Sequence, residues 1–264
     1  MKSIIDISQV TGTPQAKLWT AIIPAAGRGS RLGYDKPKIL YPLLGRTILD
    51  WLLDALIPVC DKFILVLAPD GVDEVIPSFK KRVGAAGSWV VQEKPTGMGS
   101  AVLLSKSVVE TPYSMVIWGD QVTLRKETLL ACAAIHEQRP NATMTLPTII
   151  KENPYIHLER DSNSQIKRVL QARENEIKVS HGENDCGLFL FTTSSLFPTL
   201  EKARAQGVGM GSQTSEFNLV QVLPKFENGP GSVATVRIHD PMETLGVNSV
   251  EDAQLAEQEL AKRA

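Results

Sequence analysis

A glycine-rich turn followed by two spaced cations is the part of this chain most suited to chemistry. The segment PAAGRGSRLGYDKPKIL spans residues 24–40, and it carries Arg31 and Lys38 behind a run of small residues. Small residues let backbone N–H groups approach an anion closely, and cationic side chains add charge-assisted hydrogen bonds to its oxygens. The preceding residues 19–24 are apolar and β-prone, so they predict a buried strand that ends in the turn. The segment therefore predicts a polyphosphate site at a strand end.

Two better-known glycine motifs do not describe this turn. The P-loop order GxxxxGK[ST] is absent, because the lysine follows Pro37 and lies well beyond Gly29. A dinucleotide-binding motif needs a third glycine where this chain has Leu32. Glycine-rich strand–loop segments also occur in α/β proteins that bind no phosphate, so the turn needs support from the rest of the chain.

Four further segments give that support, in order along the chain: QEKPTGMGSA (92–101), VIWGD (116–120), DCG (185–187) and LGVN (245–248). With the turn GRGSRL and the PK pair, they resemble the sugar-phosphate nucleotidyltransferases, and most of all their uridylyltransferase domain acting on N-acetylglucosamine 1-phosphate. The resemblance covers nearly the whole chain. It implies a Rossmann-like α/β fold of the nucleotide-diphospho-sugar transferase type. It also implies an enzyme that condenses a nucleoside triphosphate with a sugar 1-phosphate and releases pyrophosphate.

The same resemblance assigns catalytic and metal-binding roles. It implies that Arg31 binds the β- and γ-phosphates and that Lys38 binds phosphoryl groups near the reacting centre. The alternative for Lys38 is a solvated surface cation, as most lysines are. It makes Asp120 and Asn248 the ligands of a magnesium cofactor. One carboxylate and one amide oxygen suit Mg²⁺, which keeps positions for phosphate and water. Taken alone, an aspartate after a glycine at a strand end is more often a turn former or helix cap.

The nucleotide is expected to lie against loop backbone and one amide side chain. The resemblance gives its contacts as Ala25, Ala26, Gly27, Arg28, Gly29, Ser30, Gln92 and Gly97. Arg28 lies at the loop tip, where an arginine can equally face water. An amide both donates and accepts hydrogen bonds, so Gln92 suits uracil, thymine or cytosine. We prefer UTP or CTP as the nucleotide substrate.

The acceptor site is expected to involve Tyr155, Gln171 and Asp185. Four positions depart from the pattern of the uridylyltransferases, namely Met98, Ile156, Gln171 and Asp185. Sites that hydrogen-bond particular hydroxyls discriminate strongly when those partners change. Another phosphorylated sugar, a polyol or an amino-alcohol is therefore open as the acceptor. Asp185 either meets a cationic group of the acceptor or is a buried, hydrogen-bonded carboxylate beside Tyr155 or His157.

Composition favours an intracellular enzyme of small molecules. The net charge of −1 over 264 residues offers no basic surface for nucleic acid. Three scattered cysteines, Cys60, Cys132 and Cys186, lack CxxC spacing and predict buried thiols rather than disulfides or a zinc site. No stretch approaches the roughly 20 apolar residues of a membrane span. We expect a cytoplasmic monomer or homodimer whose partners are a nucleoside triphosphate and a phosphorylated acceptor, with no membrane or nucleic acid.

Strand and helix patterns alternate along the first half, which predicts a mostly parallel sheet covered on both faces. Strands are expected over 19–24, 62–68, 88–92, 114–118 and 142–148, and helices over 48–59, 71–83, 99–109 and 126–137. Shorter strands over 155–160, 165–172 and 188–192 predict a small β-rich substrate lobe. A helix is expected over 250–263. We interpret residues 1–264 as one domain, with a nucleotide-binding core (18–148), an acceptor lobe and metal segment (149–248) and a C-terminal helix (249–264).

Two alternatives remain open at this stage. One is a cytidylyltransferase that acts on a non-sugar phosphate or phosphonate. The other is a non-catalytic module that binds nucleotide sugars and regulates another protein. A pure binder has no need of Arg31, Lys38, Asp120 and Asn248 together, so the enzyme is the preferred hypothesis.

Overall fold

A central sheet organises the computed structural model, which describes residues 3–15 and 18–263. The described strands run in the order β1-β13-β8-β12-β7-β2-β5-β6, and β11 pairs with β8. Their bounds are β1 (Ile4–Asp6), β13 (Val233–Arg237), β8 (Met144–Glu152), β12 (Leu188–Thr192), β7 (Tyr113–Ile117), β2 (Trp19–Pro24), β5 (Lys62–Leu67), β6 (Gly87–Val91) and β11 (His181–Asp185). Strands β11 and β12 pair antiparallel with their neighbours, and the other pairings in this sheet are parallel. The predicted α/β class with a mostly parallel sheet is confirmed.

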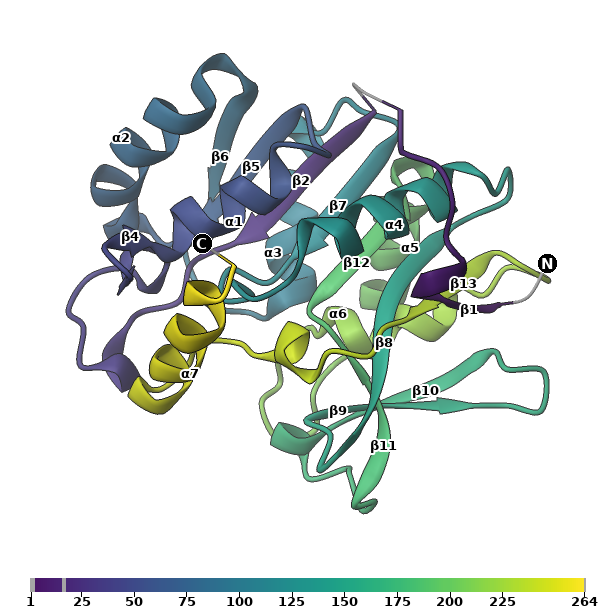
Figure 1. The fold of residues 1–264 in the computed structure, drawn as a ribbon. Coiled ribbons are helices and arrows are strands. Elements are labelled where there is room, and N and C mark those ends of the chain that lie inside the picture. The colour runs from purple at the N-terminus through teal and green to yellow at the C-terminus, as the bar shows by residue number, and fades with distance from the viewer. Residues whose placement is uncertain (1–2, 16–17, 264) are drawn as a thin grey trace.

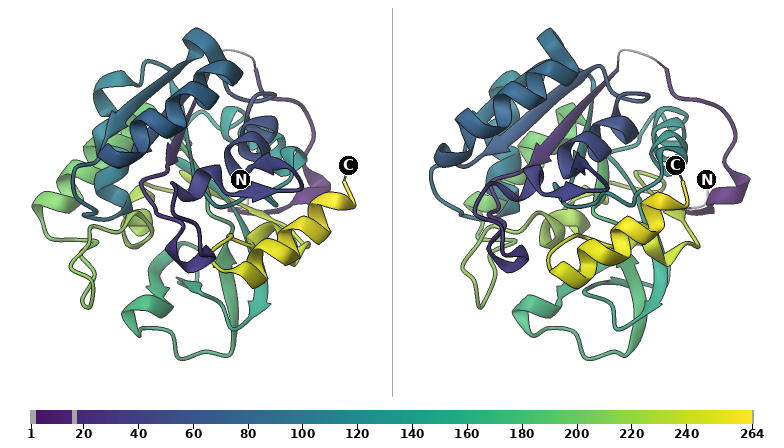
Figure 2. Two further views of the ribbon diagram at one scale, coloured as in Figure 1. Left: turned by 90° about the vertical axis from the view of Figure 1, so that its left-hand side faces the viewer. Right: turned by 60° about the vertical axis from the view of Figure 1, so that its left-hand side comes forward.

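Helices cover both faces of the sheet, as Figures 1 and 2 show. They are α1 (Ile48–Leu56), α2 (Val72–Val83), α3 (Met98–Leu104), α4 (Lys126–Glu137), α5 (Thr193–Ala205), α6 (Leu219–Val222) and α7 (Val250–Ala261). One buried cluster joins α1, α2, α4 and α7 to the sheet, and a second joins α3, α5 and α6. Within β2, Ala21 and Ile23 belong to the first cluster and Ile22 to the second, because successive side chains point to opposite faces. Burial on both faces explains the continuous apolar run of this strand.

A small lobe lies below the sheet in Figure 1. Its hairpin pairs β9 (Ile156–Arg160) with β10 (Ile166–Gln171), and β11 packs beside it on β8. The expectation that residues 188–192 belong to this lobe is wrong. They form β12 in the middle of the main sheet, between β7 and β8, where Leu188, Phe189, Leu190 and Phe191 are fully buried. Strand β8 also runs beyond the expected end at residue 148, to Glu152.

A buried ionic cluster joins the lobe to the sheet. Glu183 on β11 is 6% exposed and accepts hydrogen bonds from Arg160 on β9, from Arg237 on β13 and from Thr148 on β8. These partners lower the pKa of Glu183 against the opposing effect of its burial. Four strands are therefore tied together through one carboxylate.

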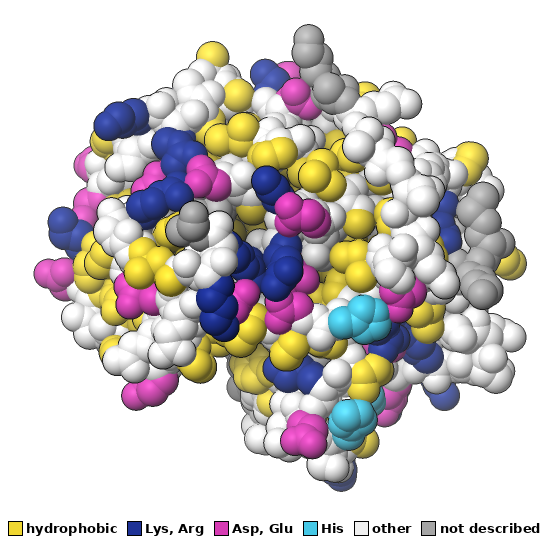
Figure 3. Space-filling view, in the orientation of Figure 1, with side chains coloured by type: hydrophobic (Ala, Val, Ile, Leu, Met, Phe, Trp, Pro, Cys, Tyr) yellow, Lys and Arg dark blue, Asp and Glu magenta, His cyan; other side chains and the backbone are white. Residues whose placement is uncertain are grey.

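The three cysteines are buried and free, as the sequence predicted. Burial raises the pKa of each thiol, and it is the largest cause in every case. No helix within the described residues is both long enough and apolar enough to cross a bilayer. Figure 3 shows basic and acidic side chains interspersed on one face of the molecule, in keeping with the net charge of −1.

Candidate active site

A cleft of about 790 Å³ opens at the carboxyl ends of the parallel strands. Its walls include residues that follow β2, β6 and β7, residues of the lobe, and the segment that leads into α7. Gly27, Gln92 and Asp120 all line it, although they lie far apart in the sequence. Ligands of open α/β sheets bind at this edge of the sheet. The cleft is therefore the candidate site.

Four predicted residues converge on one point of the cleft. The Lys38 Nζ lies 2.6 Å from Asp120 Oδ2 and donates a second hydrogen bond of 3.1 Å to Asn248 Oδ1. Arg31 Nη2 donates to the same Asn248 oxygen at 2.9 Å. The side chains of Lys38 and Asp120 are each 16% exposed, so the ion pair is largely shielded from water. The structure thus brings together both predicted cations and both predicted metal ligands.

Local backbone contacts place these four groups. Lys38 opens a short 3-10 helix (Lys38–Leu40), and its N–H donates to Gly27 O at 3.1 Å, which folds the loop back on itself. The N–H of Val247 donates to Asp120 O at 3.0 Å and joins the last segment to the end of β7. Ser249 then caps α7 through a capping box with Asp252.

The oxygen donors at this point fit a magnesium ion. Asp120 supplies a carboxylate oxygen and Asn248 an amide oxygen, and both lie within hydrogen-bond distance of one ammonium group. Within the described residues, no group of three or more His, Cys, Asp or Glu is arranged to hold a metal. Asp120 and Asn248 would hold Mg²⁺, which is commonly bound by one or two carboxylates together with substrate phosphates.

The side of the cleft that the sequence predicts to bind the nucleotide is built from backbone and one amide. Ala25, Ala26 and Gly27 line it directly after β2. Gln92 is 8% exposed, and its Nε2 donates to Gly97 O at 3.3 Å. Gly97 has a φ of +102°, and a Cβ there would lie 2.5 Å from Phe217 O, so a side chain is excluded. Gln92 and Gly97 therefore form one unit beside the glycine-rich loop.

Three residues predicted to bind the nucleotide do not line the cleft. Arg28 is 76% exposed and forms an ion pair with Asp70. Gly29 packs against Tyr34, and a Cβ at Gly29 would lie 2.8 Å from Tyr34 Cβ. Ser30 begins the exposed turn that follows. The small size of Gly29 thus serves the packing of the loop.

The predicted acceptor residues surround the other end of the cleft. Tyr155 is 59% exposed at its rim, whereas Gln171 and Asp185 are 3% and 4% exposed. Asp185 Oδ2 accepts a long hydrogen bond of 3.3 Å from Gly187 N. Burial raises the pKa of Asp185 to about 6, so the carboxyl is still mostly ionised at neutral pH. Its hydrogen-bond donor is thus a backbone N–H, and neither Tyr155 nor His157 forms a bond with it.

Several cleft residues were missed by the sequence reasoning. Lys151, Arg173, Trp118 and Gln121 all line the cleft. Lys151 lies on the part of β8 beyond the expected strand end, and Arg173 lies in the short 3-10 helix (Ala172–Glu174) that follows β10. The predicted strand ended at residue 148, and an extension by three residues would have included Lys151. No local pattern marks Gln121 apart from its position next to Asp120.

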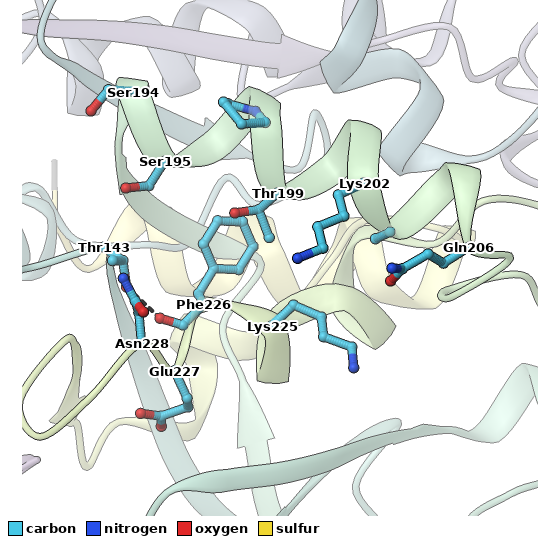
Figure 4. Close-up of a pocket in the computed structure, with 12 residues that line it drawn as sticks. Thr143, Ser194, Ser195, Thr199, Lys202, Gln206, Lys225, Phe226, Glu227 and Asn228 are labelled. Carbon is cyan, nitrogen blue, oxygen red and sulfur yellow. Dashed lines mark hydrogen bonds between the residues drawn. The ribbon is translucent and has the colours of Figure 1, made fainter.

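A second hollow of about 480 Å³ lies at the opposite edge of the sheet. Figure 4 shows Lys202 and Lys225 approaching it from α5 and from the segment after α6, with Ser195 and Thr199 on the same helix as Lys202. Thr143, at the start of β8, forms part of its wall. It contains none of the predicted site residues.

Comparison with known proteins identifies a family and several relatives. A family described as "MobA-like NTP transferase domain" matches residues 21–214. The bifunctional protein GlmU of Heliobacterium modesticaldum is 30% identical over 248 residues, covering 91% of this chain and 51% of that protein. GlmU of Lactococcus lactis is 29% identical over 248 residues, covering 92% and 52%. The chain thus spans about half the length of these relatives.

One solved structure shares the fold. The structure of 4-diphosphocytidyl-2C-methyl-D-erythritol synthase from Anaerococcus prevotii superposes with a TM-score of 0.64 at 16% identity. The match covers 94% of this chain and 100% of the other.

Proposed function

The chain belongs to the MobA-like NTP transferase family, and from that premise we propose that it is a magnesium-dependent nucleotidyltransferase. In the proposed reaction a phosphate oxygen of the acceptor bonds to the α-phosphorus of UTP or CTP, and the bond from that phosphorus to pyrophosphate breaks. The acceptor is a sugar 1-phosphate or a related phosphorylated small molecule. The observation that carries the proposal is the convergence of Lys38, Asp120 and Asn248 at the strand ends.

Each residue has a role that its position supports. Phosphoryl transfer needs reactants held in line and positive charge near the phosphoryl oxygens. Lys38, in a largely water-excluded position, contributes that charge at the reacting centre, and Arg31 contributes it on the leaving pyrophosphate. Asp120 and Asn248 would hold Mg²⁺, which neutralises phosphate charge when bound. The acceptor phosphate is already ionised at neutral pH, so no general base is needed.

Pyrophosphate release tests the proposal. Each nucleoside triphosphate is combined with Mg²⁺ and a panel of sugar 1-phosphates and phospho-alcohols. Release that depends on one triphosphate and one acceptor supports the reaction and names both substrates. The variant Asp120→Ala should lose this release while keeping the wild-type melting temperature, because the carboxylate is replaced and the sheet is not. Full activity in a folded Asp120→Ala protein would contradict the metal assignment.

A non-sugar phosphate remains the second candidate for the acceptor. Asp185 is compatible with it, because a buried carboxylate at the acceptor end can pair with a cationic group of such a molecule. A non-catalytic sensor is supported by no feature of the cleft, since the cations and oxygen donors are arranged around one reacting point.

A further inference from the structure

The acceptor end of the cleft holds a buried carboxylate without a cationic partner. Asp185, at the end of β11, is 4% exposed. Among the described residues, its side chain accepts hydrogen bonds from backbone N–H groups alone, a long one from Gly187 and one from Asp185 itself. Among the described residues it takes part in no ion pair, and Lys151 acts on it only at longer range. Glu183, two residues earlier on the same strand, is paired with two arginines. The two carboxylates on β11 thus have opposite surroundings.

Lys151 lowers the pKa of Asp185 through its charge, but within the part of the chain that the structure describes no cation forms an ion pair with this carboxylate. Lys151 Nζ is engaged with Thr244 Oγ1 at 3.2 Å. The nearby titratable groups Cys186 and Glu243 carry no positive charge. An unpaired buried carboxylate is costly, and it becomes favourable when a cation pairs with it directly. Since Asp185 lines the cleft, a bound molecule can provide that cation.

Two amide side chains that line the same cleft each have one atom without a hydrogen-bond partner among the described residues. Gln121 and Gln171 are 7% and 3% exposed and line the same cleft. Gln121 Oε1 and Gln171 Nε2 have no hydrogen-bond partner among the described residues. Gln121 lies close to Asp185, because a Cβ on Gly187 would be 2.6 Å from Gln121 Cγ. One free acceptor and one free donor therefore accompany the carboxylate, which suits the hydroxyl groups of a polar molecule.

We propose, on the basis of the nucleotidyltransferase function proposed above, that the phosphorylated acceptor carries a protonated amine that pairs with Asp185. The ammonium group supplies both the charge and the N–H donors that the carboxylate lacks. Hydroxyl groups of the same molecule meet the amides of Gln121 and Gln171. A neutral acceptor of the same shape leaves Asp185 buried and unpaired, so it binds more weakly.

Matched acceptors test this proposal. Glucosamine 1-phosphate is compared with glucose 1-phosphate, and phosphoethanolamine with ethylene glycol monophosphate, using pyrophosphate release with Mg²⁺ and the preferred triphosphate. In at least one pair we expect kcat/KM of the amine to exceed that of the alcohol by roughly ten- to hundredfold, as for a hydrogen bond to a charged group. In Asp185→Asn the ratio should fall to about one, because an amide still accepts from Gly187 N but carries no charge.

The control is Glu216→Gln. Glu216 lines the same cleft, but its carboxylate is already paired with Arg173 at 2.6 Å, so the amine-to-alcohol ratio should stay at the wild-type value. Equal or faster turnover of both alcohols by the wild-type protein would overturn the proposal and leave the nucleotidyltransferase function intact. So would an unchanged ratio in Asp185→Asn. Triphosphate binding without pyrophosphate release from any acceptor would overturn both.

Discussion

Two cations of the same loop, Arg28 and Lys38, have opposite surroundings. The Arg28 side chain is 76% exposed and paired with Asp70 outside the cleft, whereas the Lys38 side chain is 16% exposed and bonded to Asp120 and Asn248. A charge acts more strongly where water is excluded. Of these two cations, Lys38 is therefore the one whose position suits the proposed role of stabilising charge on a phosphoryl group.

We expect Lys38→Ala to lower kcat for pyrophosphate release by roughly 100- to 1,000-fold, the range seen when one donor to a developing negative charge is removed. Steady-state kinetics with the preferred substrates measures it. The matched control is Arg28→Ala, which removes a cation from the same loop and should stay within about twofold of wild type because exposed ion pairs contribute little. Comparable losses in the two variants would show that the loop acts through its overall charge.

The structure brings the four residues predicted around this point together, but it leaves part of the predicted glycine-rich loop outside the cleft. Arg31, Lys38, Asp120 and Asn248 stand in short, ordered motifs, and the strand ends bring those motifs together. Arg28 was assigned to the nucleotide because its motif contains it, but only the fold shows that Asp70 lies close enough to pair with it. An ion pair between residues that are far apart in the sequence cannot be predicted from a short motif.

A buried histidine of helix α4 forms hydrogen bonds to two strands of the sheet. His136 is 1% exposed, and its ring nitrogens lie 3.0 Å from Thr145 Oγ1 on β8 and 3.1 Å from Thr192 Oγ1 on β12. Burial lowers the pKa of His136 to about 3. The folded protein therefore keeps this histidine neutral at pH values where the unfolded chain, with an ordinary pKa near 6.5, binds a proton.

This difference predicts a pH-dependent stability. The contribution of neutral His136 is complete above about pH 6.5 and is lost as the pH falls towards 3, by about 1.4 kcal/mol for each pH unit within that window. Urea unfolding between pH 5 and 8 measures the slope, which should be flatter in His136→Gln than in wild type. The exposed His181 provides the control, and His181→Gln should keep the wild-type slope. Equal slopes in wild type and His136→Gln would contradict the assignment.

Elements with a clear local pattern were predicted closely. The bounds expected for β2 (19–24) and α4 (126–137) agree with the structure.

Strand β12 was assigned to the lobe because it follows two lobe strands in sequence, although its apolar run LFLF indicates burial on both faces. Strands β1 and β13 were not predicted, although both contain β-branched residues, because they are short and their pairing joins segments from the two ends of the sequence. Helix α5 contains Pro198 and begins with Thr-Ser-Ser, which resembles a turn.

The whole molecule is organised around the cleft, whose lining runs from the end of β2 to the first turns of α7. Asn248 receives hydrogen bonds from Arg31 and Lys38 across more than 200 residues of sequence. A ligand in this cleft contacts both halves of the chain. Its binding energy therefore adds to the stability of the entire fold, since the unfolded chain cannot bring these residues together.

This coupling predicts that UTP or CTP with Mg²⁺ stabilises the protein. At a free concentration about 100 times Kd, the gain is about 2.7 kcal/mol, which corresponds to a rise of several degrees in Tm. Thermal unfolding followed by circular dichroism measures the shift for each triphosphate, with and without Mg²⁺. In Asp120→Ala, the part of the Tm rise that depends on Mg²⁺ should be lost. In Lys38→Ala, the triphosphate should raise Tm by less than in wild type. In Arg28→Ala, the rise in Tm should equal that of wild type. A protein whose Tm does not respond to any triphosphate with Mg²⁺ would contradict nucleotide binding in this cleft, because a ligand that binds only the folded state must raise its stability.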